Sequence, residues 1–197
     1  MCTLTRLASR TVLRLALLAA LVVAAFVALS GVVAALPAPG DLWPRTTSVA
    51  APSRPSGDTT PAVVTRVIDG DTITVSTDTD PALTVRLLGI DTPEVRKPNT
   101  PVQPCGPQAS DRTRALASPG ATVHLEYDPT QDHTDRYGRA LAYVWIGDTM
   151  LNHTLVAEGW ARTYVYNHQP GRHADALADA QRDAQAARAG VWGQCPR

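Results

Sequence analysis

The sequence has no net charge, because 18 Lys and Arg are balanced by 18 Asp and Glu. A chain of this kind does not bind nucleic acid through overall basic charge alone. Cysteine is also scarce, and three Cys are too few for a disulfide-rich miniprotein. Lysine is almost missing, with one Lys against 17 Arg, and a compositional bias of the genome explains this as well as a functional need does.

Length and hydrophobic content narrow the class of protein further. The chain has 197 residues, which suits one globular domain and an additional segment, because domains are most often about 100–150 residues long. Hydrophobic residues make up 44% of the sequence. This share is too high for a disordered chain and too low for a protein with many membrane spans.

An apolar stretch near the N-terminus runs from Leu15 to Leu36, interrupted only by Ser30 and Gly31. It is longer than the usual signal-peptide core of about 7–15 residues and long enough to span a bilayer core of about 30 Å. Residues 1–36 are therefore either a long signal peptide or an uncleaved N-terminal membrane anchor. In both cases the rest of the chain is expected to leave the cytoplasm, because basic residues precede the stretch at Arg6, Arg10 and Arg14.

A linker is expected at residues 37–60, which are rich in Pro, Ser and Thr and have no hydrophobic periodicity. The folded domain then spans residues 61–197. Residues 1–60 carry five basic and two acidic side chains, so the domain carries 13 basic and 16 acidic ones. The domain is therefore mildly acidic, and the zero net charge of the chain hides this division.

The patterns in residues 61–197 predict strands, a helix, further strands and two more helices. This order indicates an α+β domain, mainly β, in which helices pack on a small Greek-key barrel rather than on repeated βαβ units. The expected strands are 62–76 (two strands joined by a tight turn, or one strand with a bulge), 83–90, 123–127, 140–146 and 161–165. The expected helices are 108–118, a short helix through 151–156 capped by Asp148 or Thr149, and 172–189.

Two motifs carry carboxylates, and each also has an ordinary structural explanation. Asp69-Gly70-Asp71-Thr72 has the composition of a tight turn and does not match the EF-hand pattern. Residues 86–94 read Arg-Leu-Leu-Gly-Ile-Asp-Thr-Pro-Glu, an apolar strand that begins with Arg and ends with two carboxylates. Such carboxylates either bind a hard cation and position a water, or form a solvated strand end paired with Arg.

Two further motifs combine tyrosine with neighbouring polar or apolar residues. Residues 135–139 read Asp-Arg-Tyr-Gly-Arg, which is either a plain hairpin turn or a guanidinium presented to a phosphate beside a stacking ring. Tyr164-Val165-Tyr166 places both rings on one face of an extended segment, where tyrosine pairs usually belong to a core or a sheet surface.

The cysteines leave two interpretations. Cys2 precedes the apolar stretch, so Cys105 and Cys195 are the cysteines of the domain. In an oxidising compartment these two most simply form a disulfide. A zinc site that combines them with His168 or His173 is the alternative, although no paired ligand spacing supports it.

Taken together and in this order, the motifs resemble the staphylococcal nuclease, or thermonuclease, family. The resemblance covers Val64 to Trp192, nearly the whole folded domain. It rests on Val-Ile-Asp-Gly-Asp-Thr at 67–72, on residues 86–94, and on Thr-Asp-Arg-Tyr-Gly-Arg at 134–139 followed by Leu141-Ala142-Tyr143. It implies a five-stranded OB-type barrel with three helices that hydrolyses phosphodiester bonds of DNA and RNA with Ca²⁺ and leaves 3′-phosphates.

The resemblance also implies a role for each site residue. The residues expected to hold Ca²⁺ are Asp71, Asp91 and the carbonyl of Thr92, with Asp69 behind them. Glu94 is expected to position or deprotonate the attacking water, and the phosphate is expected to be bound by Arg86 and Arg139. The nucleotide is expected to contact Arg136, Tyr137, Tyr164 and Tyr166.

The expected partners are DNA and RNA, and also the membrane, through residues 15–36, if these are not cleaved. The domain is expected to be a monomer and to lie outside the cytoplasm, either secreted or anchored. A catalytically silent nucleic-acid-binding barrel is the alternative function, since one fold serves several purposes. Silent copies should lose the reactive side chains, yet this sequence retains Asp71, Asp91, Glu94, Arg86 and Arg139.

Overall fold

The computed structural model describes residues 50–55, 57, 59–95 and 101–195, all within the compact unit Ser48–Arg197. The predicted signal or anchor segment 1–36 and most of the predicted linker 37–60 lie outside the described residues. In the part of the chain that the structure describes, no helix has both the length and the apolar character needed to cross a membrane.

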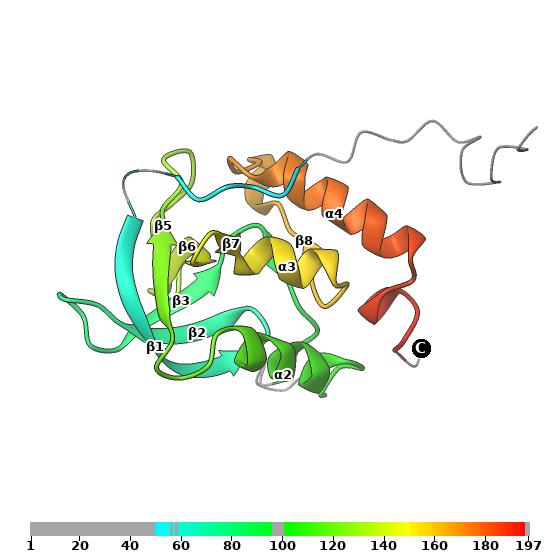
Figure 1. Cartoon of the computed structure of the whole chain (residues 1–197), viewed down its shortest axis with the longest axis horizontal. Coiled ribbons are helices and arrows are strands. Elements are labelled where there is room, and N and C mark those ends of the chain that lie inside the picture. Colours follow the sequence, from blue (N-terminus) through cyan, green and yellow to red (C-terminus); the bar gives the residue numbers. More distant parts are fainter. Residues whose placement is uncertain (1–49, 56, 58, 96–100, 196–197) are drawn as a thin grey trace, which may run out of the picture. The chain divides into compact units, whose positions relative to one another are not determined.

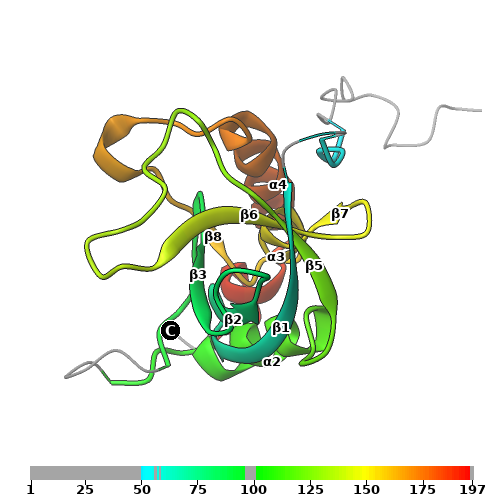
Figure 2. The same cartoon turned by 90° about the vertical axis from the view of Figure 1, so that its left-hand side faces the viewer.

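Five strands of this unit close into a barrel (Figures 1 and 2). The hydrogen-bonded order is β3-β2-β1-β5-β6, and a parallel pairing of β3 with β6 closes the ring, with Val85 opposite Ala140. The barrel strands are β1 Thr59–Asp69, β2 Thr72–Ser76, β3 Leu83–Leu87, β5 Thr122–Glu126 and β6 Ala140–Ile146. The predicted mainly β barrel is thereby confirmed, and residues 62–76 form two antiparallel strands rather than one.

Short strands and helices complete the domain. Strand β7 (Thr149–Met150) forms a hairpin with β6, and β4 (Ile90–Asp91) pairs with β8 (Arg162–Thr163). The helices are α2 Gly106–Leu116, α3 Leu151–Ala157 and α4 Ala174–Ala186, with 3₁₀ turns η1 Tyr166–His168 and η2 Gly190–Trp192. Helix α3 lies between α2 and α4 (Figure 1).

The core lies inside the barrel and under the helices. Its largest fully buried side chains include Trp145, Tyr143, Ile73, Leu125 and Leu155. Removing each such apolar side chain from water contributes about 1.5–3 kcal/mol to folding. This burial explains why alternate residues of the strands are apolar, and it provides the rigid base on which the loops of the site are mounted.

The expected strand 83–90 is wrong in its continuity, because it breaks after Leu87 into β3 and β4. Gly89 has φ +78°, a left-handed conformation that favours glycine, and a Cβ there would lie 2.9 Å from the Leu177 side chain. The turn is fixed on both sides, since Leu88 N–H donates to Ala142 O at 2.9 Å and Leu88 O accepts from Asn152 Nδ2 at 2.9 Å.

Several predicted helix ends are also wrong. The expected cap of α3 at Asp148 or Thr149 is replaced by Met150, because Thr149 pairs with Ile146 in the β6–β7 hairpin. Helix α2 begins two residues earlier than expected, with Pro107 in its first turn. The predicted helix 172–189 spans only Ala174–Ala186, and the predicted strand 161–165 is reduced to Arg162–Thr163.

Candidate active site

The turn between β1 and β2 packs directly against the residue that follows β4. A Cβ on Gly70 would lie 2.6 Å from Thr92 Oγ1, so glycine is needed for this approach. Asp71 Oδ2 accepts hydrogen bonds from the Thr92 backbone N–H at 2.9 Å and from its hydroxyl at 3.0 Å. Both residues are buried, with 7% and 3% of their surfaces exposed. Asp71 and Thr92, which are 21 positions apart in the sequence, therefore join their two motifs into one structural unit.

Arg86 joins the two carboxylates of this unit. Its guanidinium forms ion pairs with Asp91 Oδ1 at 2.8 Å and with Asp71 Oδ2 at 3.2 Å. It also donates to two backbone carbonyls, Leu87 O at 2.9 Å and Ile90 O at 2.8 Å. The side chain is only 13% exposed, and these four contacts fix its orientation.

Asp69 lies behind this cluster and is occupied by structural hydrogen bonds. Its Oδ1 accepts from Gly70 N–H at 2.8 Å and from the Ser110 hydroxyl at 3.1 Å, and its Oδ2 accepts from Val95 N–H at 3.3 Å. The carboxylate thus connects the end of β1, helix α2 and the residue after Glu94. This arrangement suits a supporting residue rather than one that contacts substrate.

Glu94 is half-buried and follows Thr92 by two residues. Gln103 forms hydrogen bonds with both backbone polar groups of Glu94. Glu94 N–H donates to Gln103 Oε1 at 3.0 Å, and Glu94 O accepts from Gln103 N–H at 2.9 Å. These two hydrogen bonds therefore join Glu94 to Gln103. Nothing in the Pro-rich sequence of residues 93–107 indicated Gln103, because the loop has no periodicity.

Arg139 enters the same region from the neighbouring strand. It directly precedes Ala140, the first residue of β6, which pairs with Val85 on β3, the strand that carries Arg86. Its partner is Asp135, which accepts from Arg139 Nε at 2.7 Å and from Arg139 N–H at 2.9 Å. Burial disfavours ionisation of Asp135, but the hydrogen bonds and charge of Arg139 outweigh it, so the pKa of this carboxyl is lowered.

The predicted nucleotide-binding tyrosines lie at the surface. Tyr137 is 69% exposed, and the guanidinium carbons of Arg136 and Arg139 lie 4.9 and 5.4 Å from its ring centroid. Tyr164 and Tyr166 are 50% and 56% exposed. Each exposed ring presents a flat face on which another planar group can stack.

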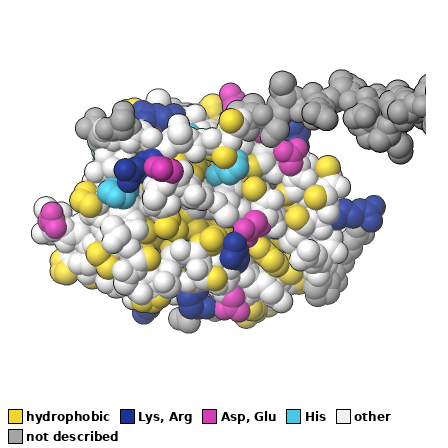
Figure 3. Space-filling view, viewed as in Figure 1, with side chains coloured by type: hydrophobic (Ala, Val, Ile, Leu, Met, Phe, Trp, Pro, Cys, Tyr) yellow, Lys and Arg dark blue, Asp and Glu magenta, His cyan; other side chains and the backbone are white. Residues whose placement is uncertain are grey.

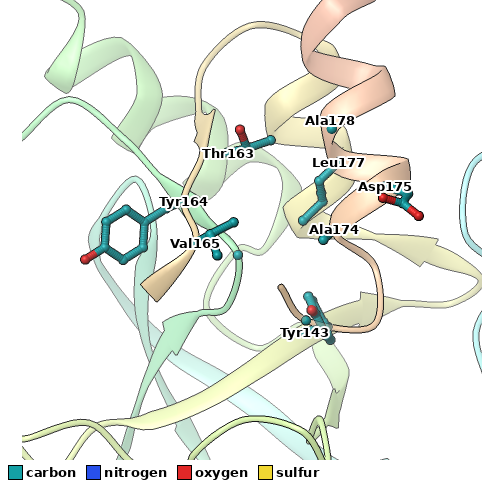
Figure 4. Close-up of a pocket in the computed structure, with 10 residues that line it drawn as sticks. Tyr143, Thr163, Tyr164, Val165, Ala174, Asp175, Leu177 and Ala178 are labelled. Atoms are coloured by element: carbon teal, nitrogen blue, oxygen red, sulfur yellow. The ribbon is translucent and has the colours of Figure 1, made fainter. Parts of the chain in front are cut away.

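A pocket of about 190 Å³ lies beside Tyr164, between β8 and α4. Figure 4 shows Val165, Leu177 and Tyr143 around it, while the Tyr164 ring points away from α4. Tyr164 is one of the residues that line this pocket, whereas Asp71, Asp91 and Glu94 do not line it.

Cys105 and Cys195 are joined in a disulfide, with their Cα atoms 5.7 Å apart. Both thiols are consumed by this bond, so the alternative zinc site with His168 or His173 is not formed. Cys105 is 7% exposed and caps the N-terminal end of α2. The disulfide therefore ties the start of α2, next to the Glu94 loop, to the C-terminal segment.

The donor groups of the cluster suit a hard divalent cation. Two carboxylates, Asp71 and Asp91, converge on one guanidinium, and the carbonyl of Thr92 belongs to the residue next to Asp91. Ca²⁺ and Mg²⁺ prefer such oxygen ligands. Within the described residues, no three His, Cys, Asp or Glu side chains form a metal-ligand cluster, so a cation here depends on backbone and water oxygens besides the two carboxylates.

Comparison with known proteins shows the family to which the chain belongs. The family described as staphylococcal nuclease homologue matches residues 84–194. The thermonuclease of Staphylococcus hyicus is 46% identical over 129 residues, which cover 66% of this chain and 73% of the relative. The thermonuclease of Staphylococcus intermedius is 45% identical over 130 residues, covering 66% and 74%, and endonuclease YncB of Bacillus subtilis strain 168 is 40% identical over 130 residues, covering 66% and 60%. The family match extends over more than half of the sequence and includes Arg86, Asp91, Glu94 and Arg139, and on these grounds the chain belongs to the staphylococcal nuclease family.

Proposed function

We propose that this protein is a Ca²⁺-dependent nuclease, exported or tethered to the membrane, that cleaves DNA and RNA and leaves 3′-phosphate ends. Membership of the family makes the chain a nuclease, an enzyme that hydrolyses phosphodiester bonds. The observation that carries the proposed metal-dependent cleavage is the Arg86 guanidinium, which lies between the carboxylates of Asp71 and Asp91.

The proposed cation site uses the side chains of Asp71 and Asp91 and the carbonyl of Thr92. A bound Ca²⁺ would neutralise phosphate charge and lower the pKa of a bound water. Asp71 is already oriented for this purpose by its two hydrogen bonds from Thr92. Asp69 fixes the surrounding turn through Gly70 and Ser110, without contributing a ligand of its own.

Arg86 and Arg139 are proposed to bind the phosphate. A guanidinium presents donors in a planar fork that matches two phosphate oxygens, and it stabilises the charge that develops on them during attack. Asp135 keeps Arg139 in place through the backbone and side chain at once.

Glu94 is proposed to accept the proton of the attacking water. The water oxygen forms a bond to phosphorus while the bond from phosphorus to the 5′-oxygen breaks, and the leaving 5′-oxygen takes up a proton from solvent water. The phosphate therefore stays on the 3′ side of the break. Tyr137, Tyr164 and Tyr166 supply exposed rings on which bases stack without regard to sequence.

The charges on the rest of the surface favour substrate binding through a metal ion rather than through basic side chains. On the face shown in Figure 3, the basic and acidic side chains of the described residues lie interspersed and form no basic patch. The domain is mildly acidic as a whole. A bound divalent ion would therefore change a phosphate-repelling site into an attracting one.

Export is proposed from the apolar stretch 15–36 and from the disulfide, because disulfides persist in oxidising compartments. The test is protease treatment of intact cells that produce the full chain. Degradation of the domain, or its presence in the medium, supports export, and full protection until lysis would contradict it. The mass of the mature N-terminus then distinguishes a cleaved signal from an anchor.

The activity is tested by incubating the protein with plasmid DNA and with RNA, in Ca²⁺ or in a chelator. Cleavage only in Ca²⁺ supports the proposal, and Glu94→Gln should lower kcat by about 10²–10⁴-fold. Glu158→Gln is the matched control, because Glu158 forms a surface ion pair with Arg112 between α2 and α3. Products that a polymerase extends only after phosphatase treatment would establish 3′-phosphate ends. Binding without any cleavage would instead support the silent nucleic-acid-binding barrel.

A further inference from the structure

Gln103 contacts both backbone polar groups of Glu94, although the two residues are nine positions apart in the sequence. Glu94 N–H donates to the Gln103 side-chain oxygen at 3.0 Å, and Gln103 N–H donates to the Glu94 carbonyl at 2.9 Å. One residue therefore fixes the peptide groups on either side of the Glu94 Cα. The direction of the Cα–Cβ bond follows from the backbone. This pairing therefore also fixes the direction in which the Glu94 side chain leaves the backbone.

Gln103 is itself attached to a rigid base. Gly106 N–H donates to Gln103 O at 3.0 Å, which closes a turn into helix α2. Gly106 lies against the Glu94 loop, since a Cβ there would be 2.8 Å from Glu94 O and 3.0 Å from Pro93 O. Cys105, between Gln103 and this glycine in the turn, is bonded to Cys195. The Gln103 side chain thus extends from a segment that the helix and the disulfide both restrain.

The other flank of Glu94 is held as well. Val95 N–H donates to Asp69 Oδ2 at 3.3 Å, and Asp69 also accepts from Ser110 on helix α2. The two supports differ in kind, because Asp69 is 7% exposed while Gln103 is solvent-exposed. A hydrogen bond made by a solvent-exposed side chain adds little to the stability of the fold. The effect of the Gln103 bond therefore lies in the geometry of Glu94.

We propose that Gln103 is a positioning residue for Glu94, and that its side-chain oxygen holds the Glu94 backbone so that the carboxylate points at the attacking water. This inference rests on the proposed function. Gln103 acts on the backbone of Glu94 and not on the phosphate-binding arginines or the exposed tyrosines. Its loss should therefore lower kcat and leave KM nearly unchanged.

The test compares two substitutions at one position. Gln103→Met keeps the length of the side chain and removes the acceptor, while Gln103→Glu keeps an acceptor for Glu94 N–H. We expect kcat to fall about tenfold in Gln103→Met, because small misplacement of a catalytic group is costly, with KM within about twofold. Gln103→Glu should recover most of this loss. Gln108→Met is the matched control, because Gln108 is an exposed glutamine on α2.

A second readout does not depend on catalysis. Amide hydrogen exchange at Glu94 should be faster in Gln103→Met, by a factor of about three or more, and near that of the unmutated protein in Gln103→Glu. If the unmutated protein cleaves and the Gln103→Met variant has the same kcat, this inference is overturned and the proposed function is not. An unmutated protein that does not cleave in Ca²⁺ would overturn the proposed function instead. Loss of kcat in Gln103→Glu equal to that in Gln103→Met would also overturn the positioning role.

Discussion

Asp71 and Thr92 are joined by two hydrogen bonds to one carboxylate oxygen, one from the Thr92 backbone N–H and one from its hydroxyl. The pair connects the β1–β2 turn to the residue after β4. Thr92 therefore orients one proposed Ca²⁺ ligand, Asp71, and supplies a second proposed ligand through its own carbonyl.

Thr92→Val tests this pair, because valine keeps the shape of threonine and removes only the hydroxyl donor. We expect Ca²⁺ affinity to fall about tenfold, the usual consequence of losing a residue that orients a metal ligand. The free energy of unfolding should fall by about 1–3 kcal/mol, because a bond to a buried charged group is lost. Calorimetric Ca²⁺ titration and urea unfolding measure the two effects.

Thr74→Val is the matched control for that experiment. The Thr74 hydroxyl is buried on β2 and has no hydrogen-bond partner among the described residues. Replacing it should leave Ca²⁺ affinity unchanged and should not destabilise the fold. If both threonine variants bind Ca²⁺ as the unmutated protein does, the orienting role of Thr92 is wrong.

Arg139→Lys tests the need for a planar fork at the phosphate. Lysine keeps the charge but cannot present two parallel donors or replace the bonds that hold Arg139 to Asp135. We expect kcat to fall by about 10²–10³-fold. Steady-state cleavage of a short oligonucleotide in Ca²⁺ measures this loss. Arg114→Lys, on the exposed face of α2, should have no effect, and equal losses in both variants would refute the specific role of Arg139.

Parts of this site were predictable from sequence and parts were not. The carboxylates and arginines lie in short motifs whose order and spacing match one family, so Asp71, Asp91 and Arg86 could be predicted as site residues without a structure. Their convergence on one guanidinium depends on the pairing of β2 with β3, which places Thr72 opposite Arg86. Gln103 could not be found, because its bonds to Glu94 cross a loop that has no hydrophobic period.

The errors in the fold have the same origin. The apolar run predicts a strand that continues through Leu88 and Gly89, but Gly89 adopts a left-handed φ of +78° and packs closely against Leu177. Asp148 and Thr149 are good capping residues in isolation, yet Thr149 pairs with Ile146 in a hairpin. In each case a contact of the folded chain outweighed the preference of single residues, at long range for Gly89 and across the β6–β7 turn for Thr149.

The Cys105–Cys195 disulfide is expected to contribute about 4 kcal/mol to stability in the chain-entropy model, since it closes a loop across a separation of 90 residues. Thiol reductant should therefore lower the midpoint of urea unfolding. The double variant Cys105→Ser/Cys195→Ser should show the same lower midpoint with or without reductant. A double variant as stable as the oxidised protein would contradict this prediction.

The acid stability of the domain should depend on Asp128. This carboxylate is 2% exposed and accepts from Arg172 N–H at 2.6 Å and from the N–H and hydroxyl of Thr130 at 2.9 and 2.8 Å. Burial disfavours its ionisation, but these bonds and the nearby Arg172 charge outweigh burial, so the pKa of Asp128 is lowered. The bonds also hold the segment before α4, which follows Tyr166, against the barrel.

A carboxyl whose pKa is lower in the folded state contributes stability above its unfolded pKa of about 3.9 and loses it as the pH falls through the folded value. Asp128→Asn should therefore destabilise the protein at pH 7, and the difference from the unmutated protein should shrink as the pH is lowered below about 4. Urea unfolding at a series of pH values measures the difference. Asp148→Asn, in the exposed β6–β7 turn, should give a constant small difference over that range. A difference for Asp128→Asn that stays constant down to pH 3 would show that its ionisation does not stabilise the fold.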